Sequence, residues 1–128
     1  MISKRLALRA VGCALAGLSV AGLIPAYAAD LKLEGTFTGE SSGSVTIVRM
    51  GDVTKLMLKD DFRLGAAPDA KLAFGHDGYI KGTIFSKLNK PRGAQEYVIP
   101  ASVDLSKYNE VWIWCEQVNV PLGSAKLK

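Results

Sequence analysis

Apolar and polar residues alternate along most of the chain beyond residue 28, and turn residues interrupt them at short intervals. Between Val45 and Val48, for example, Val45 and Ile47 would share one face of an extended segment, and Thr46 and Val48 the other. A period of two is typical of a β-strand with one buried face, whereas a helix repeats its apolar positions every three or four residues. Because no long segment shows the helical period, the pattern predicts an all-β domain.

The apolar runs and the turn residues between them predict about seven to nine short strands. Gly51-Asp52 and Asp77-Gly78 are expected to form tight turns, because glycine and aspartate tolerate the positive φ angles that hairpins require. Asp104 or Ser102 is expected to cap one helical turn that ends near Tyr108. These strands are expected among ten extended segments: Leu33 to Thr38, Val45 to Met50, Val53 to Lys59, Lys71 to Phe74, Tyr79 to Ile80, Thr83 to Leu88, Gln95 to Ile99, Glu110 to Glu116, Gln117 to Val120 and Ser124 to Leu127. Strands of this kind predict an antiparallel β-sandwich or a partly closed β-barrel.

The N-terminal segment differs from the rest of the chain in charge and in hydropathy. Three basic residues, Lys4, Arg5 and Arg9, precede an uncharged and mostly apolar stretch from Ala10 to Ile24, and Ala26-Tyr27-Ala28 follows. A basic start, a short apolar stretch and small residues at the cleavage positions are typical of a secretory signal peptide, since a membrane span needs about 20 apolar residues. We therefore expect cleavage after Ala28, which leaves one domain of residues 29–128 in the periplasm or outside the cell.

Cleavage would leave one cysteine, Cys115, and a nearly balanced charge. Three of the 16 basic residues but none of the 12 acidic residues precede Ala28, so the formal net charge falls from +4 to +1. This charge gives no indication of nucleic-acid binding. An alternative interpretation is a lipoprotein signal acylated at Cys13, but Cys13 lies only four residues beyond Arg9, and Ala10 stands where a larger aliphatic residue is preferred.

The segment from Val111 to Cys115 contains the groups with the most distinctive chemistry. Strand alternation places Cys115 on one face with Val111 and Ile113, and Trp112 and Trp114 on the other face. A cysteine among valine and isoleucine is usually a small packing residue, yet an unpaired cysteine in an oxidising compartment needs burial, a ligand or a partner. The two tryptophans either cover a second sheet or form an exposed platform for a ring-shaped ligand. The residues alone leave these alternatives open.

The remaining metal-ligating residues form no site of recognised spacing. His76, the only histidine, lies in an expected turn, and Met50 and Met57 lie in expected strands, where ordinary packing is the simpler role. The aspartates do not have the spacing of a calcium loop; they are Asp60, Asp61, Asp69 and Asp77. The sequence therefore predicts no metal site.

Other motifs also narrow the function. The chain has no Cys-x-x-Cys, no covalent haem motif, no phosphate loop and no nucleophile elbow, which argues against a hydrolytic enzyme. Lys87, Lys90 and Arg92 form a basic segment that is expected either to be solvated or to dock an acidic redox partner.

The C-terminal segments from Tyr108 to Cys115 and from Val118 to Leu127 resemble the signature of the DM-thirteen domain, which is described as an electron-transfer domain. The first has the pattern Tyr-x-x-Val-Trp-Ile-Trp-Cys, and the second contains Gly-x-Ala-x-Leu. Earlier landmarks occur in the same order, among them Gly35 to Phe37 and Gly93 to Pro100. The resemblance covers nearly all of the expected mature domain.

This resemblance implies an extracytoplasmic electron-transfer or thiol-redox module. It implies that Cys115 acts as a redox thiol or holds a prosthetic group such as haem, with Trp112, Trp114 and Tyr97 as candidate cofactor-binding residues. The partner would be an unidentified redox protein or small molecule, and the domain would carry electrons rather than turn over a substrate. The alternative is a β-sandwich that binds a partner or has a structural role, with Cys115 as inert packing.

Overall fold

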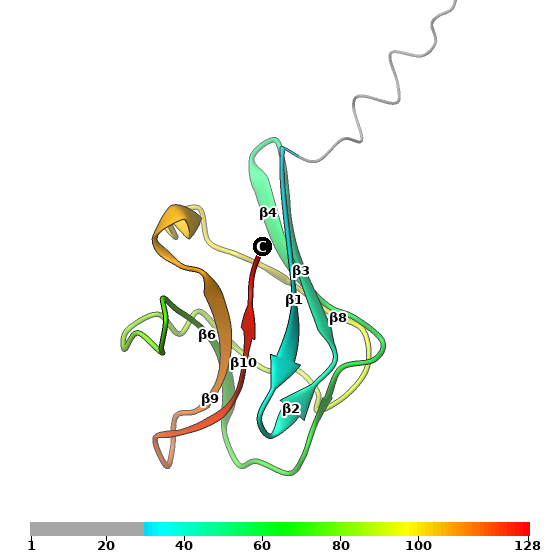
Figure 1. The fold of residues 1–128 in the computed structure, drawn as a ribbon, viewed down its shortest axis with the longest axis vertical. Helices are drawn as coiled ribbons and strands as arrows, with labels where there is room; N and C mark the ends of the chain where they lie inside the picture. Colours follow the sequence, from blue (N-terminus) through cyan, green and yellow to red (C-terminus); the bar gives the residue numbers. More distant parts are fainter. Residues whose placement is uncertain (1–29) are drawn as a thin grey trace, which may run out of the picture.

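The computed structural model describes residues 30–128 of the chain. This part contains ten β-strands, one short 3-10 turn and the loops that connect them (Figure 1). The expected signal peptide, its cleavage site at Ala28 and Cys13 lie outside the described residues. The strands are β1 (Leu31–Thr38), β2 (Ser41–Ser42), β3 (Ser44–Met50), β4 (Val53–Leu58), β5 (Arg63–Leu64), β6 (Ala70–Gly75), β7 (Ser86–Lys87), β8 (Gln95–Val98), β9 (Glu110–Cys115) and β10 (Val120–Lys126). The 3-10 turn η3 (Leu105–Lys107) lies between β8 and β9.

Eight of these strands form one antiparallel sheet in the order β7-β6-β9-β10-β1-β3-β4-β8. The sheet is nearly closed into a barrel, with β6, β9 and β10 on one side and β1, β3 and β4 on the other (Figure 1). The remaining two strands, β2 and β5, pair as a small second sheet. The all-β, antiparallel class predicted from the alternating pattern is confirmed.

The core lies between the two sides of the bent sheet and consists of the inward-facing residues of each strand. In β3 and β4, Val45, Ile47, Leu56 and Leu58 are almost completely buried and lie opposite one another in register. Burying an aliphatic side chain of this size stabilises the fold by about 1.5 to 3 kcal/mol before entropy is counted. The period of two in the sequence therefore identifies the core face of these strands correctly.

Several predicted turns are also confirmed. Gly51 links β3 to β4 with a φ angle of 64°, and Asp77 has a φ angle of 53° in the turn after β6. Asp104 caps η3 by accepting a hydrogen bond from the backbone N–H of Ser106. In the described residues, no helix is long and apolar enough to cross a membrane.

Three strand predictions are wrong at particular positions. Residues 117–120 were expected to extend as a strand, but residues 116–119 form the hairpin turn between β9 and β10, in which Asn119 has a φ angle of 57°. Tyr79 to Ile80 is reduced to a single bridge between Gly75 and Tyr79, and only Ser86–Lys87 of the segment Thr83 to Leu88 is a strand. The polar loop after β1, in turn, contains β2. Apolar residues in short segments do not by themselves determine whether a neighbouring strand is available to pair with them.

Candidate functional site

Cys115 is the last residue of β9, and its side chain is buried in the core. It is 1% exposed, and Val111 and Ile113 on the same face are fully buried. Its partners in the ladder are Ala70 at the start of β6 and Val120 at the start of β10. Val120 is 41% exposed and Ala70 is half-buried, so the thiol lies beside residues that themselves reach the surface. Cys115 is also the only cysteine of the described residues, and it has no disulfide partner there.

Trp112 and Trp114 project from the opposite face of β9, on the outer surface of the barrel. Both are half-buried, with their ring centroids 6.2 Å apart. Tyr79, from the turn after β6, stacks on Trp114 with a centroid separation of 3.8 Å and an interplanar angle of 7°. The three rings form an aromatic cluster on the outer face of the large sheet, and the turn that carries Tyr79 partly covers it. The tryptophans therefore neither cover a second sheet nor form a fully exposed platform for a ring-shaped ligand, which were the two alternatives that the sequence left open.

The neighbouring strands leave room for the Trp112 ring because the residues beside it are small. Trp112 lies between Ala73 of β6 and Ser124 of β10 in the ladder. A Cβ atom on Gly75 would collide with the Trp112 ring, so glycine is required where the ring crosses β6. The sequence carried this signal in the small residues Ala73, Gly75 and Ser124, but only the strand order shows that they flank the ring.

Glu110 holds the aromatic cluster together, a role that the sequence analysis missed. Its side chain is 7% exposed, and its Oε1 accepts hydrogen bonds from Trp112 Nε1 at 3.0 Å and from the Gly78 backbone N–H at 2.8 Å. Lys126 Nζ lies 3.8 Å from the other carboxylate oxygen. The carboxylate thus fixes both one indole ring and the turn that carries Tyr79. The available signal was its position two residues before Trp112, which places it on the same face of the strand.

Tyr97, the third candidate cofactor-binding residue, lies elsewhere. Its side chain is inside the barrel on β8, where it is 6% exposed, whereas the two tryptophans are on the outer surface. Its hydroxyl group accepts a hydrogen bond from the Asn89 N–H at 2.8 Å and donates one to Gln95 Oε1 at 2.6 Å. Burial raises the pKa of this phenol above its ordinary value, which keeps it protonated. The structure therefore does not bring Tyr97 together with Trp112 and Trp114.

His76 is exposed in the turn after β6, at the end of β9 where Glu110 lies. Cys115 is five residues further along that strand, which corresponds to about 17 Å. The imidazole is also exposed to solvent, and its Nε2 lies 4.0 Å from Asp77 Oδ2. Cys115 and His76 thus form neither a catalytic pair nor a pair of ligands to one metal atom.

A haem held by Cys115 does not fit this arrangement. The face of β9 that carries the thiol is filled by Val111, Ile113 and Leu72, none of which is exposed. His76, the only histidine, is exposed about 17 Å along the sheet from Cys115, so it would not hold the same haem. Among the described residues, no three His, Cys, Asp or Glu side chains gather closely enough to hold a metal ion. The residues present do not form a haem site.

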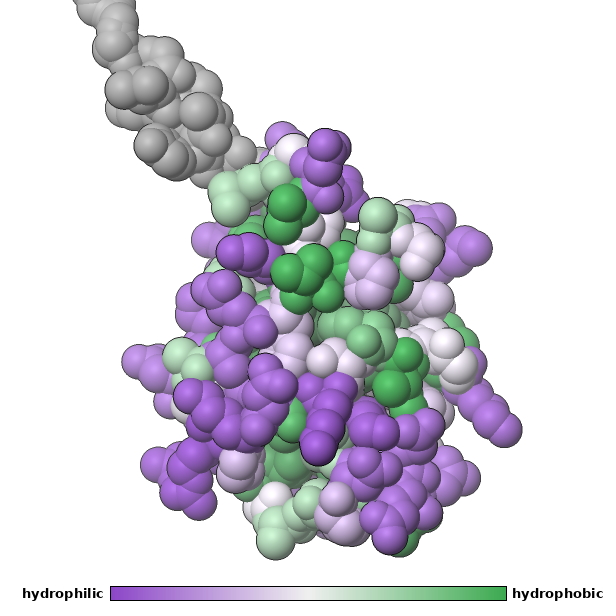
Figure 2. Space-filling view, turned by 180° about the vertical axis from the view of Figure 1, so that it is seen from behind, coloured by the Kyte–Doolittle hydropathy of each residue, from purple (hydrophilic) through white to green (hydrophobic). Residues whose placement is uncertain are grey.

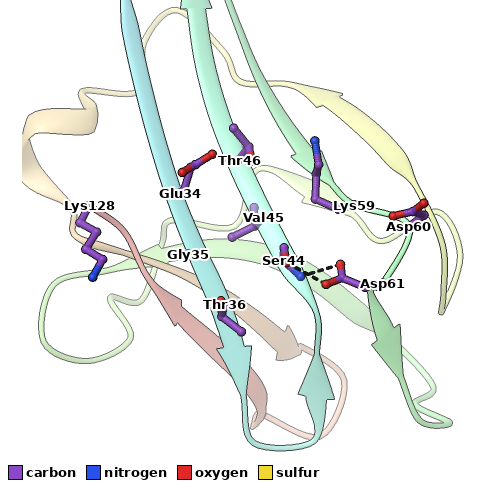
Figure 3. Close-up of a pocket in the computed structure, with 10 residues that line it drawn as sticks. All are labelled: Glu34, Gly35, Thr36, Ser44, Val45, Thr46, Lys59, Asp60, Asp61 and Lys128. Atoms are coloured by element: carbon purple, nitrogen blue, oxygen red, sulfur yellow. Dashed lines mark hydrogen bonds between the residues drawn. The ribbon is translucent and has the colours of Figure 1, made fainter.

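A surface hollow lies away from the thiol, across the outer faces of β1 and β3 (Figure 3). Asp61 lies at one side of it, and its two carboxylate oxygens accept hydrogen bonds from the backbone N–H and the hydroxyl group of Ser44, at 2.9 Å and 2.8 Å. These bonds lower the pKa of Asp61. Both Asp61 oxygens are therefore occupied by Ser44, and this carboxylate serves to join the start of β3 to the segment after β4.

The fold and the site define an all-β, antiparallel domain that is nearly closed into a barrel, with one thiol in its core and an aromatic cluster on its outer surface. The family model described as electron transfer DM13 matches residues 35–127. The chain therefore belongs to this family, which confirms the resemblance inferred from the C-terminal segments. The match includes Cys115 and both tryptophans. No curated protein and no solved structure matches the chain.

Proposed function

We propose that this protein is an electron-transfer module of an extracytoplasmic compartment, and that the Cys115 thiol is its redox-active group. The observation that carries the proposal is the family match over residues 35–127, within which Cys115 is the only cysteine. Aromatic residues and carboxylates do not exchange electrons readily with common biological carriers, whereas a thiol is oxidised reversibly. The proposal assigns no role to haem, because the residues around Cys115 do not fit one.

The chemistry of a single thiol determines how such a module would work. Each thiol gives one electron to an acceptor and one proton to water, and two oxidised sulfur atoms then join as a disulfide. Since the described residues contain no second cysteine, the partner sulfur comes from another molecule. The position of Cys115 at the end of β9, beside the partly exposed residues Ala70 and Val120, supports this role because a small opening of that end would expose the sulfur.

Replacing Cys115 with alanine is expected to remove electron transfer and leave the fold intact. The test uses the processed protein and hexacyanoferrate(III), whose reduction is followed by the loss of its absorbance. The parent should transfer one electron per chain, and Cys115→Ala none. Loss of the buried sulfur should lower the free energy of unfolding by only about 1 kcal/mol.

Val45→Ala is the control for lost core packing, because it removes more side-chain volume than Cys115→Ala does, from the opposite side of the core, and keeps the thiol. It should lose stability and still reduce hexacyanoferrate(III). If Cys115→Ala folds and reduces the acceptor as well as the parent does, electron transfer through this thiol is wrong. The second candidate would then hold: a binding or structural module with an inert cysteine, which is favoured by the 1% exposure of Cys115.

The extracytoplasmic location rests on the N-terminal pattern of basic, apolar and small residues before Ala29. We expect protein isolated from its native cells to begin at Ala29, because Ala26-Tyr27-Ala28 has the small residues that signal peptidase requires. Intact-mass measurement tests this. A mass that includes Met1 would contradict export by cleavage, and a diacylated Cys13 would show a membrane-anchored lipoprotein instead.

A further inference from the structure

Four cations are exposed near the end of the barrel at which Cys115 lies, and we call them the basic end: Arg63, Lys87, Lys90 and Arg92. None of them forms an ion pair with an acidic residue of the described chain; the pairs that do form involve Lys32, Lys55, Lys71, His76 and Lys126. Residues 1–29 contain no Asp or Glu that could neutralise them. Hydrophilic side chains are dense over the lower part of the molecule in Figure 2, which is the end that carries β2 in Figure 1.

Arg63 and Arg92 stand directly opposite each other in an antiparallel bridge. On the other side, Arg63 is paired with Ser42 of β2, so a hydroxyl group and two guanidinium groups form one row. Like charges that face each other directly across a ladder destabilise a sheet. The fold nevertheless retains this pair at the surface. A carboxylate seated between the two guanidinium groups would convert the repulsion into two charge-assisted hydrogen bonds.

The loop that carries Lys90 and Arg92 is held in place by buried groups. Gln95 is 8% exposed, and its Nε2 donates hydrogen bonds to the carbonyl oxygens of Lys90 at 3.0 Å and Gly93 at 3.1 Å. The Tyr97 hydroxyl group fixes Asn89, the residue before Lys90, by accepting a hydrogen bond from the Asn89 backbone N–H. A loop that is ordered in this way loses little entropy when a ligand binds to it.

A mainly apolar groove connects the basic end to the neighbourhood of the thiol. It runs between residues 64–70 and residues 87–91, so its lining begins beside Arg63 and ends at Ala70. Ala70 is the ladder partner of Cys115, one strand spacing or about 5 Å away. The acidic residue in the lining, Asp69, is paired with Lys71 at 3.3 Å.

We infer that the basic end and this groove are the docking face for an acidic patch on a redox partner protein. The inference deepens the proposed function and rests on it. Complexes between electron-transfer proteins are small and weak, and complementary charge brings the partners together in the right orientation. A carboxylate-bearing partner on Arg63 and Arg92 would cover the groove and come within one strand of the Cys115 thiol. No other face combines unpaired cations with proximity to that thiol among residues 30–128.

Binding is tested first, without any electron transfer, by fluorescence anisotropy with a labelled hexaglutamate peptide. We expect Arg63→Glu/Arg92→Glu to weaken binding at low salt by at least about tenfold, and rising salt to weaken binding to the parent. The matched control is Lys81→Glu/Lys107→Glu, which changes the net charge equally at exposed positions away from the basic end. Equal loss in both double variants would overturn the inference, because it would show only a net-charge effect.

The second test measures electron transfer to two acceptors of opposite charge, hexacyanoferrate(III) and tris(phenanthroline)cobalt(III). In both reactions the thiol gives one electron to the metal complex and one proton to water, and the oxidised sulfur atoms join in pairs as disulfides between molecules. The variant at Arg63 and Arg92 should react about tenfold more slowly with the anion and faster with the cation. Unchanged rates with both acceptors would overturn the inference. A parent that reduces neither acceptor while still binding the peptide would refute the proposed function and leave a basic docking face for an acidic partner.

Two further outcomes would assign the face to a different occupant and contradict an acidic protein partner. The first is self-association of the parent that the variant loses, measured by analytical ultracentrifugation. The second is tighter binding to phosphatidylglycerol vesicles than to the peptide. Folding is checked by the thermal midpoint, which the neutral variant Arg63→Gln/Arg92→Gln should keep or raise because it removes the like-charge contact.

Discussion

Replacing Gly123 with alanine is expected to destabilise the domain by about 4 kcal/mol, the largest single effect of any substitution considered. Gly123 lies at the irregular point of β10, with a φ angle of 144° that side chains rarely adopt. An added Cβ would collide with the buried Ser41 Oγ and approach the Thr38 carbonyl oxygen to 2.9 Å. A domain of this size has a total stability of about 5 to 15 kcal/mol, so the variant should be marginally folded. Urea unfolding followed by tryptophan fluorescence measures the effect.

Gly65→Ala is the matched control, because no atom lies within 4 Å of a Cβ built there. It should unfold close to the parent midpoint. Ser41→Gly/Gly123→Ala should recover part of the lost stability, since it removes the hydroxyl group that collides with the new methyl group. If Gly123→Ala unfolds at the parent midpoint, this explanation is wrong. The contact between β10 and the loop that follows β1 would then not require glycine at position 123.

Replacing Trp114 with alanine is expected to lower the free energy of unfolding by about 3 kcal/mol. The ring stacks on Tyr79, and its Nε1 donates a hydrogen bond to Asn119 Oδ1 at 3.1 Å in the turn between β9 and β10. Loss of the ring therefore loosens both turns. Urea unfolding measures the effect, and a double-mutant cycle with Tyr79→Ala isolates the stacking contribution.

Trp114→Phe separates the two contributions of the side chain. It retains an aromatic ring against Tyr79 but loses the hydrogen bond to Asn119 and part of the ring area, so it should lose about 1 to 2 kcal/mol, less than Trp114→Ala. Electron transfer from Cys115 should persist in both variants, because the thiol lies on the other face of β9. If Trp114→Ala unfolds like the parent and loses a bound ring-shaped ligand instead, the tryptophans form a ligand platform, and the cluster is not needed for stability.

The close approach at Gly123 lies near the short contact between β1 and β10. β1 pairs with β3 over most of its length, but with β10 it pairs in the sheet ladder only at Phe37 and Thr38. Gly123 lies beside this short contact, where the backbone of the loop after β1 comes within van der Waals distance of β10. The Gly-x-Ala-x-Leu segment that identified the family thus lies where the two sides of the barrel meet.

Local patterns in the sequence determined the fold class and much of the site. Alternation with a period of two is a property of the extended backbone, so it assigned Cys115 to the core face and the two tryptophans to the other face before any partner strand was known. Turn residues with positive φ angles, such as Gly51 and Asp77, were found for the same reason: their conformation depends on the residue itself.

Contacts between distant segments were decided only by the tertiary structure. The period of two places Glu110 and Trp112 on one face but does not say what covers that face, so the stacking of Tyr79 on Trp114 and the hydrogen bond from the Gly78 N–H to Glu110 could not be predicted. The basic segment at Lys87, Lys90 and Arg92 was visible in the sequence, but Arg63 joins it only because the chain folds back to pair residue 63 with residue 92. Such pairings depend on the order of strands in the sheet, which is set by the packing of the whole core rather than by any local run of residues.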